Sequence, residues 1–113
     1  MRYRELADAI RRGIKFMPYQ TFYVDFDGKG GACAFATAMV GCGENTGQSF
    51  LEWAKHHKIQ DYIVSQVVSF NDVSRMPREQ IADWLDSLEE PGESDSDWAK
   101  RKVAEVTRVK EAA

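Results

Sequence analysis

The stretch from Thr21 to Gly43, TFYVDFDGKGGACAFATAMVGCG, constrains the fold more than any other part of the chain. Aromatic and β-branched residues alternate with polar ones from Tyr19 to Phe26, which predicts a strand with one buried face. Asp27-Gly28 and the glycines that follow predict a tight turn, because glycine takes positive φ without strain. A short return strand at 30–33 would complete a two-stranded ribbon.

An alanine-rich helix is expected after this ribbon, over Ala32 to Val40. Its small side chains would let neighbouring helices come close, so we place it at the centre of the fold. Gly41 and Gly43 predict its end. The fold class that these patterns predict is α+β and mainly helical, with five or six helices around a short two-stranded antiparallel β-hairpin.

Apolar residues spaced three and four apart predict further helices on both sides of this stretch. Before it, Tyr3 to Met17 carries one buried stripe. After it, we predict helices that start near Thr46 or Gly47, that span 59–70 and that open at Pro77, with a loop over 71–76.

The chain is expected to form one globular domain over residues 1–90, followed by an acidic linker over 91–97 and a C-terminal helix over 98–113. Residues 79–97 carry eight acidic side chains and no basic one. The apolar stripe of the last helix is thin, so we expect this helix to be mobile or to dock on a partner. The candidate binding residues on it are Trp98, Val103, Val106 and Val109.

The charge balance argues against a nucleic-acid-binding protein. The 113 residues carry 15 basic and 18 acidic side chains, a formal net charge of −3. Nucleic-acid-binding proteins present strongly basic surfaces, so we do not expect nucleic acid as a partner. No apolar run approaches the ~18 residues of a membrane span and no signal-peptide pattern is present, so we expect a cytoplasmic protein without membrane contact. Cys33 and Cys42 would lie about 13 Å apart on one helix, too far for a disulfide.

One set of residues could support chemistry. A cysteine at a helix N-terminus, as predicted for Cys33, has its thiolate stabilised by unpaired amides and by the helix dipole. His56 or His57 could take its proton, and Asn71 or Asp72 could orient that imidazole. The order Cys, His, Asn resembles that of papain-like cysteine peptidases. The catalytic set under this hypothesis is Cys33, His57 and Asn71; the simpler interpretation is that Cys33 is a small buried residue.

Two metal hypotheses fail on ligand type and spacing. Asp25 begins a run like an EF-hand loop, but a lysine holds its fifth position and Ala36 its twelfth, where a bidentate glutamate is required. Cys33 and Cys42 are farther apart than the two to four residues typical of a structural zinc pair. We therefore expect no metal, and no motif predicts a cofactor.

Two segments carry a family resemblance. The first is Asp25…Gly30-Gly31-Ala32-Cys33-Ala34-Phe35-Ala36, which resembles the "D…G…CA-x-GA" segment of a family of small uncharacterised bacterial and phage proteins. The second runs from Phe70 to Leu85, FNDVSRMPREQIADWL, and resembles the later "ND" loop and final helix of the same family. The resemblance covers about residues 5–88. It implies this architecture and a phage or mobile-element origin, and it implies no activity.

Together these features favour a small non-enzymatic protein-interaction module, encoded by a phage or mobile element and acting on a host protein. Its partner would be another protein or a second copy of the chain. The alternative is a cysteine-dependent hydrolase or transferase that uses Cys33 with His56 or His57 and with Asn71 or Asp72. A reactive thiol at Cys33 would distinguish the alternative from the interaction module.

Overall fold

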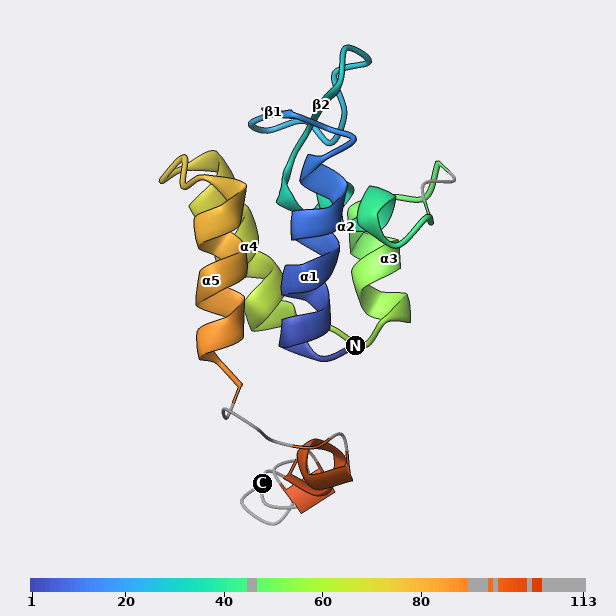
Figure 1. Ribbon diagram of the computed structural model, residues 1–113, viewed down its shortest axis with the longest axis vertical. Helices are drawn as coiled ribbons and strands as arrows, with labels where there is room; N and C mark the ends of the chain where they lie inside the picture. The colour runs from blue at the N-terminus through green and yellow to red at the C-terminus, as the bar shows by residue number, and fades with distance from the viewer. Residues whose placement is uncertain (45–46, 90–93, 95, 102, 105–113) are drawn as a thin grey trace.

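Residues 1–44, 47–89, 94, 96–101 and 103–104 are described by the computed structural model (Figure 1). Its helices are α1 (Tyr3–Ile14), α2 (Ala34–Gly41), α3 (Phe50–His56), α4 (Asp61–Asp72) and α5 (Arg78–Ser87). Two short strands, β1 (Tyr19–Gln20) and β2 (Gly31–Ala32), form the sheet, and the described tail residues 96–101 and 103–104 are helical. The predicted class, α+β and mainly helical, is confirmed.

The pair α1 and α2 forms the centre of the fold, as the small residues of α2 predict. All residues from Ala34 to Met39 are buried, so α2 contacts other elements on every side. A Cβ atom added at Gly13 would lie 1.9 Å from the backbone oxygen of Thr37, and one at Gly41 would lie 1.9 Å from that of Ala9. Glycine at both positions therefore sets how closely the two helices pack.

The remaining helices complete the core around this pair. Large side chains without solvent exposure fill the centre, among them Trp53 of α3, Ile63 of α4 and Leu85 of α5. The prediction of a helix over 59–70 is confirmed. That helix begins and ends two residues later than predicted, so that its last turn includes Asn71 and Asp72, which we expected in a loop.

The antiparallel β-hairpin predicted over 19–33 is wrong. β1 and β2 pair in parallel, with Tyr19 opposite Gly31 and Gln20 opposite Ala32. At Phe26 the chain does run antiparallel to β2, as predicted, and forms an isolated bridge to Ala32. The chain therefore reverses once between β1 and Phe26, and again at the glycine turn before β2.

Side chains at the end of α4 account for the unexpected first reversal. Asn71 Nδ2 donates to the backbone oxygen of Thr21 at 2.9 Å, and Asp72 Oδ1 accepts from the backbone nitrogen of Tyr23 at 2.9 Å. Thr21 Oγ1 donates to the backbone oxygen of Val24 at 2.7 Å and closes the bend. These bonds satisfy backbone groups that a partner strand would otherwise pair with, so the segment leaves the sheet after β1.

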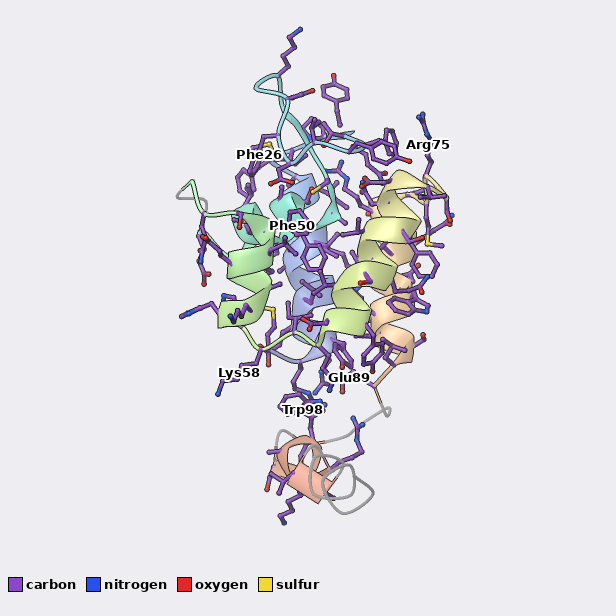
Figure 2. All side chains as sticks on the ribbon, turned by 180° about the vertical axis from the view of Figure 1, so that it is seen from behind. Phe26, Phe50, Lys58, Arg75, Glu89 and Trp98 are labelled. Atoms are coloured by element: carbon purple, nitrogen blue, oxygen red, sulfur yellow. The ribbon has the colours of Figure 1, made fainter. Side chains whose placement is uncertain are left out.

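The described part of the tail lies at the opposite end of the molecule from the sheet. Figure 2 shows Glu89 and Trp98 at one end and Phe26 at the other. The guanidinium carbon of Arg2 lies 5.5 Å from the centre of the Trp98 ring, and Arg101 lies 3.7 Å from the Glu89 carboxylate. The described part of the tail therefore contacts Arg2, which precedes α1, and Glu89, two residues beyond the end of α5.

Across the described ranges, no helix has both the length and the apolar character that crossing a bilayer requires.

Candidate functional site

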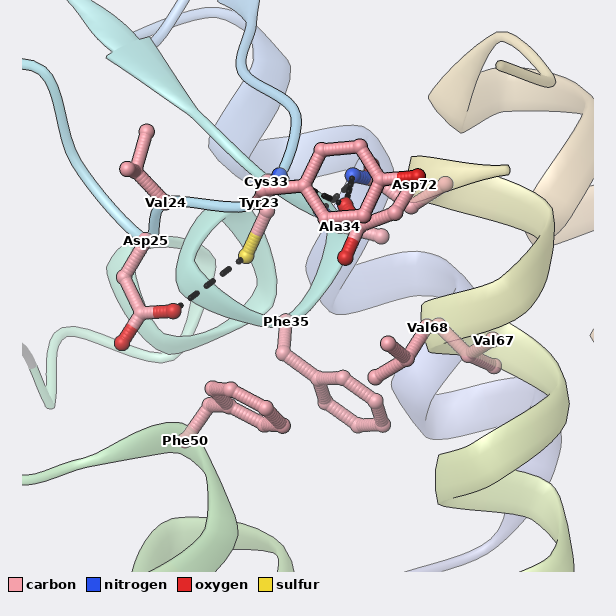
Figure 3. A pocket seen from close by; sticks show the side chains of 11 residues that line it. Tyr23, Val24, Asp25, Cys33, Ala34, Phe35, Phe50, Val67, Val68 and Asp72 are labelled. Carbon is pink, nitrogen blue, oxygen red and sulfur yellow. Dashed lines mark hydrogen bonds between the residues drawn. The ribbon is translucent and has the colours of Figure 1, made fainter. Parts of the chain in front are cut away.

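A pocket lies where the loop after β1 meets the ends of three helices (Figure 3). Its empty volume, open mouth included, is about 360 Å³. The N-terminal ends of α2 and α3, the C-terminal half of α4 and the loop each contribute to the lining. The lining residues are Tyr23, Val24, Asp25, Cys33, Ala34, Phe35, Phe50, Val67, Val68, Asn71 and Asp72.

Apolar side chains form the floor of this pocket. The rings of Phe35 and Phe50 stack, with centroids 5.5 Å apart and planes inclined by 14°. Val67 and Val68 of α4 continue the same surface (Figure 3). Phe35 is buried, whereas Phe50 and Val68 are half-buried and so remain accessible from the mouth. Such a floor suits an aliphatic or aromatic group.

Asn71 joins the elements that form the wall. Its Oδ1 accepts hydrogen bonds from Gln20 Nε2 at 2.9 Å and from the backbone nitrogen of Ala34 at 3.1 Å. Its Nδ2 donates to the backbone oxygen of Thr21 at 2.9 Å and to Asp72 Oδ1 at 2.7 Å. All four hydrogen-bonding positions of the amide are thereby used. Asn71 is committed to the scaffold, where it ties β1, α2 and α4 together.

Cys33 is the N-cap of α2 and faces the pocket. Its sulfur accepts a hydrogen bond from the backbone nitrogen of Ala36 at 3.5 Å and lies 4.0 Å from Asp25 Oδ1, to which it donates. Burial raises the pKa of the Cys33 thiol to about 11, and the charge of Asp25 adds to this effect. The thiol is therefore protonated at neutral pH, although its place at a helix N-terminus favours a thiolate.

Two carboxylates line this pocket on different sides, Asp25 from the loop and Asp72 from α4 (Figure 3). Burial raises the pKa of Asp25, and the nearby charge of Asp72 raises it further. In the part of the chain that the structure describes, no lysine, arginine or histidine forms an ion pair with either carboxylate. The pocket therefore combines an apolar floor with negative charge that no cationic side chain of the described residues balances.

Tyr23 stands at the rim in a strained conformation. Its φ is 63°, in the left-handed region that non-glycine residues seldom adopt, and its side chain is 70% exposed. Such a conformation costs on the order of 1–3 kcal/mol and persists only where the surroundings enforce it. The hydrogen bond from its backbone nitrogen to Asp72 is one such constraint.

The two histidines of the catalytic hypothesis lie away from the pocket. His56 is the last residue of α3 and His57 its C-cap, whereas Phe50, the first residue of that helix, lines the pocket. Seven residues of helix separate the two ends by about 10 Å. His57 Nε2 is hydrogen-bonded to Glu44 Oε2 at 2.8 Å, and its ring lies 4.7 Å from that of Trp53.

The structure thus brings Cys33, Asn71 and Asp72 together at one pocket and leaves His56 and His57 outside it. A general base must lie within hydrogen-bond reach of the proton that it takes. In this arrangement neither imidazole has that position relative to the thiol, and the amide that would orient an imidazole is fully bonded elsewhere.

Metal ligands do not converge in the described residues, where no group of three or more His, Cys, Asp or Glu side chains could hold an ion. Cys33 and Cys42 are free thiols, the first buried and the second half-buried. Asp25, the first residue of the run that begins like a calcium loop, instead faces the apolar pocket.

The candidate binding residues of the tail divide into three kinds. Trp98 is half-buried against Arg2 and so contacts the protein itself. Val103 is 67% exposed. Val106 and Val109 lie outside the described residues, and their part in a binding surface stays a prediction.

Several pocket residues are not expected from the sequence. Phe50 and Val68 fit a helical core stripe and Tyr23 fits a strand, yet all three line the pocket. For Tyr23, the sequence did offer one signal of a contact surface. Tyr19 and Tyr23 lie close together in a short segment, and exposed tyrosines are typical of contact surfaces.

No protein-family model matches this chain, and no curated protein and no solved structure is significantly similar to it. The function of the pocket must therefore be inferred from its own geometry and charge. The resemblance to small bacterial and phage proteins stays an expectation from the sequence.

Proposed function

We propose that this chain is a small non-enzymatic protein-interaction module that binds its partner with the end of the molecule formed by residues 16–25. The family resemblance adds a phage or mobile-element origin. The remaining sequence expectations complete the proposal, with action in the cytoplasm and a host protein as the partner. The observation that carries the proposal is a set of large apolar side chains that are more than half exposed on this short segment. They are Phe16 at 69%, Tyr19 at 66%, Tyr23 at 70% and Val24 at 52%.

A partner that covered these side chains would gain hydrophobic free energy. Full burial of one large apolar side chain is worth roughly 1.5–3 kcal/mol relative to leaving it in water. Single exposed apolar residues are normal on protein surfaces, but these four belong to one short segment, and Figure 1 shows that the segment around β1 lies at one end of the molecule. Tyrosine is also enriched among the residues that dominate binding energy at interfaces.

The segment is held in one shape before it binds. Asn71 and Asp72 bond its backbone at Thr21 and Tyr23, and the Thr21 side chain closes the bend between them. A surface that is already ordered loses less conformational entropy on association. The hydrogen bonds that bend the chain away from the predicted hairpin therefore also support a binding role.

The cysteine-dependent alternative receives no support from the geometry. Burial holds the pKa of the Cys33 thiol near 11, and both histidines are at the far end of α3 from the pocket. We therefore do not carry a hydrolase or transferase forward as a second proposal.

Replacement of two exposed tyrosines tests the interaction proposal. The double variant Tyr19→Ser with Tyr23→Ser removes apolar area from the proposed surface. Tyr62→Ser is the matched control, because Tyr62 is 62% exposed but lies in the first turn of α4. Light scattering measures self-association, and affinity capture from a bacterial lysate measures binding of other proteins.

We expect the wild-type chain and the Tyr62→Ser control to bind equally, and the double variant to bind at least tenfold more weakly. Equal binding by all three proteins would show that the partner contacts another face. Circular dichroism of the double variant separates loss of binding from loss of fold.

A further inference from the structure

We propose that the pocket beside Tyr23 receives the side chain of a lysine or arginine from the partner protein. This inference rests on the proposed interaction function and adds the chemistry of the partner residue. The feature that carries it is the juxtaposition of a stacked phenylalanine floor with two carboxylates on different sides of one pocket.

The apolar floor of the pocket suits the methylene stem of a lysine or arginine side chain. Lysine and arginine place an apolar stem of three or four methylene groups behind a charged head, and bury that stem against apolar surface. The stacked rings of Phe35 and Phe50, with Val68 beside them, provide such a surface at the base of the pocket. The pocket is open at its mouth, so a side chain can enter it from solvent.

The two carboxylates of the pocket suit the charged head group of lysine or arginine. Asp25 and Asp72 are each half-buried at the pocket, and the described residues provide neither with a cationic partner. Two like charges near each other disfavour ionisation, and a cation between them relieves that repulsion. Ionised carboxylates also form the stronger, charge-assisted hydrogen bonds with ammonium and guanidinium groups. A neutral or acidic side chain would leave the negative charge unbalanced.

The remaining groups at the pocket do not compete with this occupant. Asn71 has no free hydrogen-bonding position, and the Cys33 sulfur is the N-cap of α2. Aromatic faces attract cations as well as alkyl groups, so the exposed ring of Tyr23 at the rim adds to the preference.

Titration of the full-length, ¹⁵N-labelled chain with capped amino acids tests the proposal. The probes are the N-acetyl methylamides of lysine, arginine, norleucine and glutamate, followed by amide chemical shifts. Norleucine matches the stem of lysine without its charge. We expect lysine or arginine to shift the amides of Val24, Cys33 and Val68 and to bind at least fivefold more tightly than norleucine, with no binding by glutamate.

The variant Asp25→Asn is expected to weaken lysine or arginine binding about tenfold. It keeps the shape of the side chain, and its backbone bond from Cys33 nitrogen is unaffected. Asp61→Asn is the matched control, since it makes the same charge change in an exposed residue at the start of α4, and it should leave binding unchanged.

Equal binding of norleucine and lysine, or unchanged binding by Asp25→Asn, would overturn the proposal. Tighter binding of n-butylammonium chloride than of capped lysine would overturn the assignment to a protein side chain. If these titrations fail while the tyrosine pair still controls partner capture, the interaction function stands and the lysine or arginine assignment is lost.

Discussion

Asn71 shows how one buried polar residue can determine a local conformation. The side chain is 2% exposed, and its bonds reach a strand residue, a bend and the first turn of α2. Buried polar groups are tolerated when they are fully paired, and a network of this kind favours one arrangement over its alternatives. Asn71 thereby fixes β1, which includes the exposed Tyr19, and the start of the loop that bears the exposed Tyr23.

We expect Asn71→Ala to lower the free energy of unfolding by about 2–4 kcal/mol. The change leaves the backbone nitrogen of Ala34 and the backbone oxygen of Thr21 without this partner, and each such group costs about 1–3 kcal/mol when buried. Urea denaturation followed by tryptophan fluorescence measures the effect. Gln80→Ala, an exposed amide on α5, should change stability by less than about 0.5 kcal/mol. A loss as small as that of the control would contradict the structural role of Asn71.

The raised pKa of Asp25 gives a second prediction at this scale. Because the folded protein binds this proton more tightly than the unfolded chain, stability falls as pH rises through the ordinary aspartate pKa, ~3.9, and then through the raised pKa of the folded state. Asp25→Asn should therefore be more stable than the wild type at pH 7 and equal to it below about pH 3. Thermal unfolding across this range measures the difference, and a variant less stable at pH 7 would refute it.

The buried thiol gives a third prediction. With Cys42 replaced by serine, alkylation of the remaining Cys33 by iodoacetamide should be slow at neutral pH and should rise only as pH approaches about 11. Unfolded protein in urea provides the reference rate for an unhindered thiol. Rapid alkylation of the folded variant at pH 6 would restore the catalytic hypothesis.

Among the elements, α1 and α2 depend on small residues where they cross. Helix formation alone favours alanine over glycine by about 1 kcal/mol, so glycine at positions 13 and 41 needs another reason. That reason is the neighbouring backbone, which occupies the place of the missing Cβ atoms. A backbone atom cannot rotate away as a side chain can, so any added carbon must move a whole helix.

Gly13→Ala is accordingly expected to destabilise the fold by about 1–3 kcal/mol despite its better helix propensity. Chemical denaturation measures the change. Ser65→Ala, at an exposed position of α4, adds an alanine where space is open and should be neutral or slightly stabilising. Equal effects of the two substitutions would mean that α1 and α2 can move apart without a loss of stability.

Most helices could be predicted from the sequence because spacing of apolar residues is a local property. α1 and α5 follow from their stripes, and the alanine-rich composition placed α2 at the centre. The direction of the two strands could not be predicted, since it depends on Asn71 and Asp72, which lie about fifty residues from the bend. The pocket could not be predicted either, because residues from four separate segments of the chain line it.

At the scale of the whole molecule, the two ends differ in chemistry. One end presents exposed aromatic residues and a pocket with two acidic side chains, and the other brings the start of α1 against Glu89 and Trp98 (Figure 2). The sequence pattern predicted the tail as a docking helix, but Trp98 already has a partner in Arg2. The proposed binding surface and the tail contacts thus lie at opposite ends of the molecule.

Trp98→Ala should lower the free energy of unfolding by about 1 kcal/mol, through loss of the cation–π contact with Arg2. Val103→Ala is the control from the same helical segment, because Val103 is 67% exposed and should matter little. Denaturation curves of the full chain measure both changes. Neither change should affect partner capture by the tyrosine surface, and a loss of capture in Trp98→Ala would place the tail in the interface.

The contact between Arg2 and Glu89 has a consequence for how the chain is made. These residues are separated by 87 positions, and Glu89 also accepts a bond from the backbone of Tyr3. A ribosome adds residues from the N-terminus onward, so α1 emerges long before the carboxylate that anchors its first turn has been synthesised. The bonds at the start of α1 can therefore form only after Glu89 has emerged. Likewise, until Asn71 and Asp72 emerge, the newborn chain exposes its aromatic segment without the side chains that later bond its backbone.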